Sequence, residues 1–300
     1  MTQSPRFMGA LTALVTPFQA DGSLDLNAFR QLIDKQVAAG IDGLVVCGST
    51  GEAHTLSVDE RVELVRVCVE QVKGRMPVIA GAGSSSTQTA CDLQKQMKAV
   101  GADATLHVMP WYNKPTQEGL YQHFAAIARA ADLPLIMYNV PSRTCCDISA
   151  DTVLRLAKEF SNIVGLKECN LEPLRLQSLL GDLKILRADF AVFTGEDGFV
   201  LPLLAMGGHG VISVFGNLAP KMAIELIQAF RQNDFETAQT LAGRLAALTS
   251  LMFFRSNPIP VKSALYLRGD VQNVFRLPLC PLNSDDMTYL KTELSKQGWL

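Results

Sequence analysis

The 300-residue chain lacks an excess of positive charge, because 27 Lys and Arg residues are balanced by 29 Asp and Glu residues to a net charge of -2. Proteins that bind nucleic acids through phosphate groups usually carry a basic excess, so the composition argues against this class. The sequence also lacks runs of like charge, low-complexity segments and linker-like stretches. We therefore expect neither a disordered tail nor a flexible junction between separate domains.

Sequence motifs for metals and nucleotides are missing as well. There is no HExxH, no GxGxxG and no Walker-type phosphate loop. The four histidines, at positions 54, 107, 123 and 209, are scattered, and none belongs to a cluster with Cys or carboxylate residues. The sequence therefore indicates no metal site and no cofactor.

The seven cysteines do not form a disulfide framework, because their number is odd and none lies in a CxxC motif. This pattern favours a reducing cytoplasm. One uncharged stretch, residues 198–220, is long enough to span a membrane, but Pro202 and Gly207-Gly208-His209-Gly210 interrupt it. We interpret it as a buried helix followed by a buried strand, and we expect no membrane association.

What is present is a series of eight short apolar runs, mostly about thirty residues apart, which is the length of one strand–helix unit. Their residues do not alternate between polar and apolar, as is typical of parallel strands that are buried on both faces. The runs are residues 10–15, 43–47, 77–80, 104–108, 135–138, 163–166, 191–193 and 211–214.

Helical patterns lie between these runs. The clearest begins with the capping box Ser57-Val58-Asp59-Glu60 and continues with valines at helical spacing, and Ser149 is a candidate N-cap for another helix. Eight such units predict an α/β fold, a (β/α)8 TIM barrel; a doubly wound sheet is the alternative, which the missing GxGxxG disfavours. We expect the barrel to comprise residues 1–233. A C-terminal helical extension, residues 234–300, would pack on it, with helices at 234–255 and 284–296.

In such a barrel the chemistry lies at the carboxyl ends of the strands, and Lys167 ends the sixth run. A desolvated lysine loses its proton more readily, and the neutral amine can form a Schiff base with a carbonyl compound. The alternative is an ion pair with Glu168 or with a carboxylate across the barrel. Tyr138, at the end of the fifth run, is a candidate acid/base for the same reaction, or else a core tyrosine.

After the second run, the segment Gly48-Ser49-Thr50-Gly51 combines glycines with hydroxyl groups beside a predicted helix start. Backbone amides in such a segment suit a carboxylate or phosphate.

Several segments together resemble the superfamily of dihydrodipicolinate synthases and N-acetylneuraminate lyases, the pyruvate-dependent class I aldolases. The resemblance covers nearly the whole chain and implies the barrel fold. It is carried by residues 15–18, 48–52, 77–83, 112–115, 138–144, 167–168, 207–213 and 257–262.

The resemblance implies that Lys167 forms a Schiff base with pyruvate and that Tyr138, Ser49 and Tyr112 relay protons. Tyr112 would reach a neighbouring active site, which implies a homodimer or homotetramer. The positions that would bind substrate are Thr50 for the pyruvate carboxylate, Gly195 and Ile212 for the wall of the pyruvate pocket, and Arg143 for the carboxylate of an aldehyde substrate.

The second substrate depends on two positions with opposite implications. Arg143 favours the synthases, which condense pyruvate with L-aspartate 4-semialdehyde on the route to diaminopimelate and lysine. Ser49 is more typical of the lyases, so the alternative is an aldolase or dehydratase that acts on 2-keto-3-deoxy sugar acids, sialic acid or aromatic pyruvate adducts. A third hypothesis is a catalytically silent barrel that binds a metabolite. We expect the synthase reaction, because Arg143 would contact the part of the substrate that differs.

Overall fold

The computed structural model of the chain describes residues 5–300 and contains eight parallel strands in a closed barrel. Each strand pairs with the next, and the eighth pairs with the first. The strands are β1 (Gly9–Ala13), β2 (Gly43–Val46), β3 (Val78–Gly81), β4 (Ala104–Val108), β5 (Leu135–Asn139), β6 (Ile163–Glu168), β7 (Ala191–Thr194) and β8 (Gly210–Ser213). The barrel prediction is confirmed, and the doubly wound alternative is wrong.

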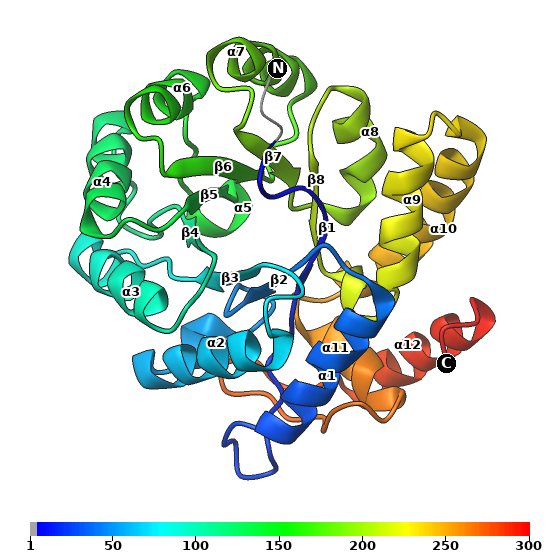
Figure 1. Ribbon diagram of the computed structural model, residues 1–300. Helices are drawn as coiled ribbons and strands as arrows, with labels where there is room; N and C mark the ends of the chain where they lie inside the picture. The colour runs from blue at the N-terminus through cyan, green and yellow to red at the C-terminus, as the bar shows by residue number, and fades with distance from the viewer. Residues whose placement is uncertain (1–4) are drawn as a thin grey trace.

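Helices surround the strands as an outer ring (Figure 1). The ring consists of α1 (Leu26–Ala39), α2 (Val58–Val72), α3 (Thr87–Ala99), α4 (Gln117–Ala130), α6 (Ala150–Glu159), α7 (Pro173–Leu186), α8 (Val200–Ala205) and α9 (Pro220–Arg231). The short helix α5 (Pro141–Thr144) lies inside the ring, beside β5 and β6 in this view (Figure 1). Three short 3-10 turns lie in the loops, namely η1 (Ala53–Thr55), η2 (Asp197–Phe199) and η3 (Phe215–Asn217).

Two of the predicted helix starts have the capping contacts that their sequences indicate. The Ser57 hydroxyl accepts a hydrogen bond from the Glu60 amide, and the Glu60 carboxylate accepts one from the Ser57 amide at the start of α2. Ser149 caps α6 in the same way through the Thr152 amide. These contacts satisfy amides that have no partner inside the helix.

The strands bury both of their faces. Alternate residues point into the barrel and outward to the helices, because side chains along a strand change face at every residue. The inward-facing side chains form one compact cluster, which includes Leu11, Val45, Ile79, Leu106, Ile136, Tyr138, Phe193 and Ile212. The outward-facing ones pack under the helices in two larger clusters.

Three more helices follow the barrel, α10 (Phe235–Phe253), α11 (Ile259–Leu267) and α12 (Ser284–Lys296), and α12 lies at the periphery (Figure 1). The first and last confirm the predicted helices. The sequence pattern did not predict α11, because Pro258 and Pro260 lie at its start; prolines are tolerated in the first turn of a helix. The division into a barrel of residues 1–233 and an extension of residues 234–300 stays a prediction, and residues 1–4 lie outside the described part.

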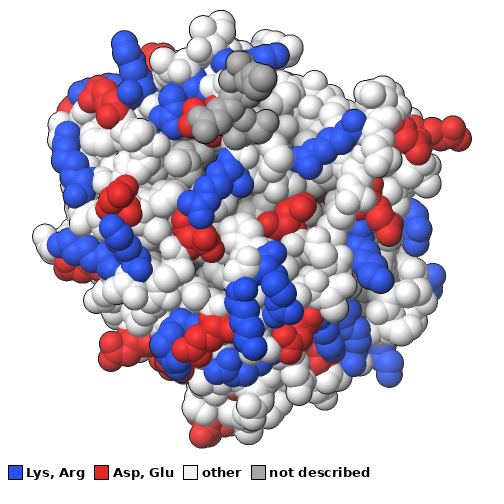
Figure 2. Space-filling model, viewed as in Figure 1, with Lys and Arg blue, Asp and Glu red and all other residues white. Residues whose placement is uncertain are grey.

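The uncharged stretch 198–220 contains α8 and β8, as predicted. Within the described residues, no helix is both long and apolar enough to cross a membrane. On the face shown in Figure 2, positive and negative side chains are intermixed, in keeping with the near-neutral net charge.

Candidate active site

A cavity of about 190 Å³ lies at the carboxyl ends of the strands. Six of the eight predicted site residues line it, together with residues that the sequence did not single out. The six are Ser49, Thr50, Tyr138, Arg143, Lys167 and Gly195. They come from β5, from β6 and from the segments after β2, β5 and β7, so the barrel brings together residues that are far apart in the chain.

Lys167 belongs to β6, and its side chain points into the barrel, where the residue is only 6% exposed. Burial lowers the pKa of the Lys167 ammonium, and the positive charge of Arg143 acts in the same direction. The neighbouring Cys169, Asp197 and Glu196 side chains oppose this shift. More of the neutral, nucleophilic amine is therefore present at neutral pH than in a free lysine.

The ion pair considered for Lys167 is not formed within residues 5–300. Glu168 follows Lys167 in the strand and therefore points to the opposite face. There its carboxylate pairs with Arg175 at 2.9 Å and accepts a hydrogen bond from Asn139 at 2.8 Å. The interpretation of Lys167 as a partner of Glu168 is therefore wrong, because strand alternation separates the two side chains.

Tyr138 is the register partner of Lys167 on β5, and the Lys167 Nζ lies 4.3 Å from the centre of the tyrosine ring. Burial and the neighbouring Cys169 thiol raise the pKa of the Tyr138 hydroxyl well above its ordinary value. The phenol therefore keeps its proton at neutral pH and can donate it to a reacting oxygen. Burial also raises the pKa of Cys169 to about 12, so this thiol is not a nucleophile at neutral pH.

The Asp197 side chain is buried beside the lysine and accepts hydrogen bonds from the Val214 amide at 2.9 Å and the Phe215 amide at 3.0 Å. Burial raises its pKa to about 6, although these hydrogen bonds act against the shift. Asp197 thus holds the segment after β8 against the segment after β7, and Val214 forms part of the cavity wall.

The segment after β2 supplies Ser49 and Thr50. Ser49 is half-buried, and Thr50 is buried with its Oγ1 accepting a hydrogen bond of 3.0 Å from the Asn257 side-chain amide. A hydroxyl that accepts such a bond still has its own proton to donate. Both residues therefore offer O–H donors to a ligand in the cavity.

Gly195 lies next to Lys167, after β7. A Cβ atom at this position would be 2.6 Å from Lys167 Cε and would also overlap Cys169 Sγ. Only glycine leaves room for the lysine side chain and for a small molecule attached to it.

Arg143, on α5, lies at the mouth of the cavity, and its side chain is exposed. One guanidinium nitrogen donates to the Asn257 carbonyl at 3.2 Å, and no carboxylate within the described residues forms an ion pair with it. The remaining donors of the guanidinium are available to an anionic group of a ligand.

The other two predicted residues do not line this cavity. Ile212 is fully buried in the interior cluster on β8, below the cavity wall that Val214 forms. Tyr112 is 93% exposed and has a left-handed backbone, φ +75°, which is rare for a residue with a side chain.

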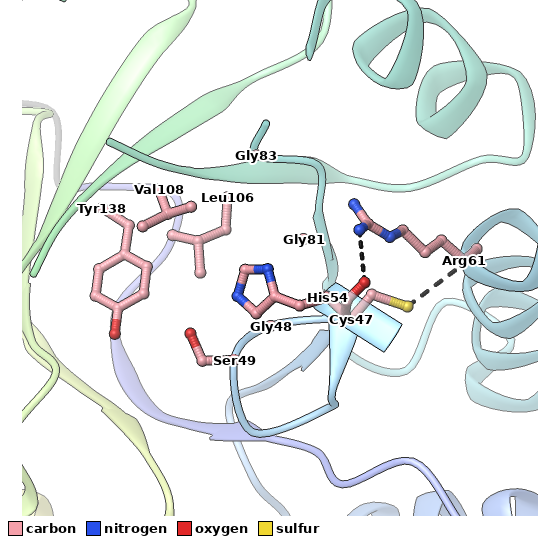
Figure 3. Close-up of a pocket in the computed structure, with 11 residues that line it drawn as sticks. Cys47, Gly48, Ser49, His54, Arg61, Gly81, Gly83, Leu106, Val108 and Tyr138 are labelled. Carbon is pink, nitrogen blue, oxygen red and sulfur yellow. Dashed lines mark hydrogen bonds between the residues drawn. The ribbon is translucent and has the colours of Figure 1, made fainter. Parts of the chain in front are cut away.

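A smaller cavity of about 20 Å³ adjoins the first and shares Gly48, Ser49, Leu106 and Tyr138 with it. Figure 3 shows the Tyr138 ring, the Ser49 hydroxyl and the His54 ring around this space, and Arg61 approaches it from α2. The His54 ring packs edge-on against Trp111, with 5.2 Å between ring centres.

Asn257 is the main site residue that the sequence did not single out. It lies just before α11, lines the cavity and contacts both Thr50 and Arg143. The only signal for it is the segment 257–262 that carried the resemblance, without any indication of which residue faces the site. Among residues 5–300, no group of three or more His, Cys, Asp and Glu side chains is arranged to hold a metal ion.

Comparison with known proteins finds a matching family and close relatives. The profile described as the dihydrodipicolinate synthetase family matches residues 6–297. A relative from Nitratidesulfovibrio vulgaris, named 4-hydroxy-tetrahydrodipicolinate synthase, is 47% identical over 295 residues, which are 98% of this chain and 100% of the relative.

Solved structures agree with this match. The chloride-inhibited dihydrodipicolinate synthase from Acinetobacter baumannii, complexed with pyruvate, is 41% identical and superposes with a TM-score of 0.93 over 98% of this chain and 100% of that one. A monomeric dihydrodipicolinate synthase variant is also 41% identical, with a TM-score of 0.95 over 98% of both chains.

Proposed function

Because the chain belongs to the dihydrodipicolinate synthetase family, we propose that it is a lyase that condenses pyruvate with L-aspartate 4-semialdehyde, on the route to diaminopimelate and lysine. The observation that carries the proposal is Lys167, a buried amine without an ionic partner in the described chain, which lies beside Tyr138 in the wall of the cavity. The related enzyme from Acinetobacter baumannii is complexed with pyruvate.

The first step is imine formation. The neutral amine of Lys167 attacks the C2 carbonyl of pyruvate, and the carbonyl oxygen takes up protons and leaves as water. Tyr138 lies beside Lys167 and can donate a proton to this oxygen, since its raised pKa keeps the phenol protonated. Ser49 lines the same cavity and extends the relay toward solvent.

The pyruvate carboxylate binds at the segment after β2. Thr50 offers its hydroxyl, directed by the bond that it accepts from Asn257, and Gly195 leaves room beside the imine. These contacts orient the methyl group of pyruvate into the open part of the cavity. Loss of a proton from this methyl group gives the enamine, which is the carbon nucleophile of the condensation.

The enamine attacks the aldehyde carbon of the second substrate, and Arg143 binds the carboxylate of that substrate at the cavity mouth. Guanidinium and carboxylate groups match in shape and can form two parallel hydrogen bonds. The amino group of the semialdehyde then attacks the imine carbon, which closes the ring and releases Lys167.

We further propose that Tyr112 acts at the active site of a second copy of the chain. Its exposed ring and strained backbone support a role toward a second copy of the chain, where it would complete the proton relay of the neighbouring site. A homodimer or homotetramer follows from this role. One structural relative is a monomeric variant. The family fold therefore does not by itself fix the oligomeric state, and size-exclusion chromatography with light scattering would measure it. We also propose a cytoplasmic location, which the seven free cysteines support.

A second candidate keeps the imine and changes the acceptor. Ser49, the residue more typical of the lyases, favours an aldolase or dehydratase for 2-keto-3-deoxy sugar acids, sialic acid or aromatic pyruvate adducts. A silent, metabolite-binding barrel is disfavoured by the arrangement of Lys167 and Tyr138.

The test is intact mass after treatment with pyruvate and borohydride, together with a coupled assay that contains L-aspartate 4-semialdehyde. We expect a reduced pyruvyl adduct on Lys167 and turnover, both of which Lys167→Ala abolishes. An adduct without turnover would direct the search to the sugar-acid acceptors. Failure to trap any 2-keto acid would favour the silent barrel.

A further inference from the structure

Lys262 and Glu52 form an ion pair that is closed off from solvent. The Lys262 Nζ lies 2.6 Å from a carboxylate oxygen of Glu52, and both side chains are 0% exposed. Glu52 directly follows the segment Ser49-Thr50-Gly51, and Lys262 belongs to α11. The pair therefore joins the candidate carboxylate-binding segment to a helix near the end of the chain.

The buried ion pair is expected to contribute little net stability to the folded protein. Removing two charges from water costs free energy that their attraction offsets only in part, so apolar substitutes of the same size often stabilise a protein equally well. Burial lowers the pKa of Lys262 to about 8 and raises the pKa of Glu52, which reflects this cost. The second oxygen of Glu52, Oε2, has no hydrogen-bond partner within the described chain.

The ion pair lies at the end of the turn that contains Thr50. Glu52 has a left-handed backbone, φ +53°, and its amide donates to the Ser49 carbonyl at 3.1 Å, which closes a tight turn around Thr50. The Thr16 hydroxyl donates to the Gly51 carbonyl at 2.7 Å from the other side. Lys262 holds the far end of this turn, and its ammonium lies 4.1 Å from the centre of the Phe18 ring. The side chain of Glu52 thus fixes where the turn ends.

The residues just before the same helix contact Thr50 directly. Asn257, just before α11, donates from its side-chain amide to Thr50 Oγ1 at 3.0 Å, in a buried contact. Because the hydroxyl oxygen accepts this bond, the Thr50 proton is still available to a ligand, and Thr50 lines the cavity. α11 therefore controls both the backbone around Thr50 and the direction of its hydroxyl.

We propose that Asn257 and the Lys262–Glu52 pair are positioning residues through which α11 orients Thr50, and that they determine the affinity for the carboxylate of the 2-keto acid. The chemical step at Lys167 does not depend on them. The proposal rests on the proposed function, because it assigns the carboxylate of pyruvate to Thr50.

The test compares Asn257→Ala, the double variant Glu52→Gln/Lys262→Met and the control Arg255→Met. The double variant avoids a lone buried charge. The control breaks the ion pair of Arg255 with Asp286 in the same C-terminal region, and neither of these two residues lines the cavity. We expect the KM for pyruvate, and the pyruvate concentration for half-maximal borohydride trapping, to rise about fivefold to tenfold in the first two variants, as one lost hydrogen bond implies. The kcat stays within about twofold of the unmodified protein, and Arg255→Met changes neither quantity.

A mutant cycle with Thr50→Val shows whether Asn257 acts through Thr50. We expect Asn257→Ala to have little further effect on the KM for pyruvate once the Thr50 hydroxyl is absent. An unchanged KM in Asn257→Ala, a fall in kcat alone, or the same effect of Asn257→Ala in both backgrounds would overturn the proposal. If the double variant does not fold, Asn257→Ala and its cycle decide the question. Absence of an adduct in the unmodified protein would instead overturn the proposed function, and this inference with it.

Discussion

Lys167 and Tyr138 are register partners on neighbouring strands of the barrel, with the lysine Nζ 4.3 Å from the centre of the tyrosine ring. Partners in parallel strands place their side chains on the same face, and here that face is the interior of the barrel. The amine and the phenol are therefore held together by strand pairing, and neither depends on a flexible loop. Burial makes the amine easier to deprotonate and the phenol harder to deprotonate.

Tyr138→Phe should therefore remove the proton donor and leave the nucleophile in place. We expect the kcat to fall by about 10²- to 10⁴-fold, which is the usual contribution of a positioned acid/base group, with little change in the KM for pyruvate. Steady-state kinetics and the rate of borohydride trapping measure the two effects. A kcat close to that of the unmodified protein would show that another group supplies the proton.

Gly195→Ala should block adduct formation, because the new methyl group would overlap Lys167 Cε and Cys169 Sγ. Gly198→Ala is the matched control, since a Cβ atom there meets nothing within 4 Å. We expect the first variant to lose pyruvate trapping and about 1–3 kcal/mol of stability, and the second to retain both. Mass spectrometry measures the reduced pyruvyl adduct in both variants. Equal amounts of adduct in the two variants would contradict the assigned position of the substrate.

Arg143→Ala tests the second substrate. Loss of a charge-assisted contact at this partly open position should raise the KM for L-aspartate 4-semialdehyde roughly tenfold, while pyruvate trapping is unchanged. Arg143→Lys retains the charge but not the paired donors, so we expect it to recover only part of the loss. Normal kinetics with the semialdehyde in Arg143→Ala would favour the sugar-acid alternative.

We expect the free energy of unfolding to decrease in acid, because two buried histidines are neutral in the folded protein. Burial lowers the pKa of His107 to about 3 and that of His123 to about 4, whereas the unfolded chain has values near the ordinary 6.5. The unfolded state therefore binds more protons below pH 6.5, so the free energy of unfolding is greatest above that pH and decreases as the pH falls toward 4. Each histidine contributes about 1.4 kcal/mol per pH unit in this window.

Denaturant unfolding between pH 4 and 7.5 measures this dependence. His107→Gln should reduce the slope by one proton, because it removes a group that titrates only in the unfolded chain. A slope that is the same with and without His107 would show that this histidine is not buried in its neutral form.

The position of Lys167 was predictable because strand period and barrel geometry place it. An apolar run that ends in a lysine puts that side chain at the carboxyl end of a barrel strand, and the eight runs coincide with the eight strands to within two residues. The capping box of α2 was predictable for the same reason, since its contacts lie within one helical turn.

The wall of the cavity was less predictable. Ile212 lies in β8, and Val214 follows the end of that strand. Ile212 is deeper in the barrel and belongs to the interior cluster, whereas Val214 lines the cavity. The sequence allowed an ion pair between Lys167 and Glu168. In the structure the two side chains lie on opposite faces of β6, and Glu168 pairs with Arg175.

The sequence by itself determined the eight strands and the position of Lys167 in the sixth, because each depends on residues within one strand. The number and spacing of these strands predicted the barrel. Only the tertiary structure decided how the cavity is held, since Thr50 meets Asn257 and Glu52 meets Lys262 across about two hundred residues. No local pattern marks such contacts. They form only when the barrel closes and α11 packs against it, which brings residues 257–262 beside the loop after β2.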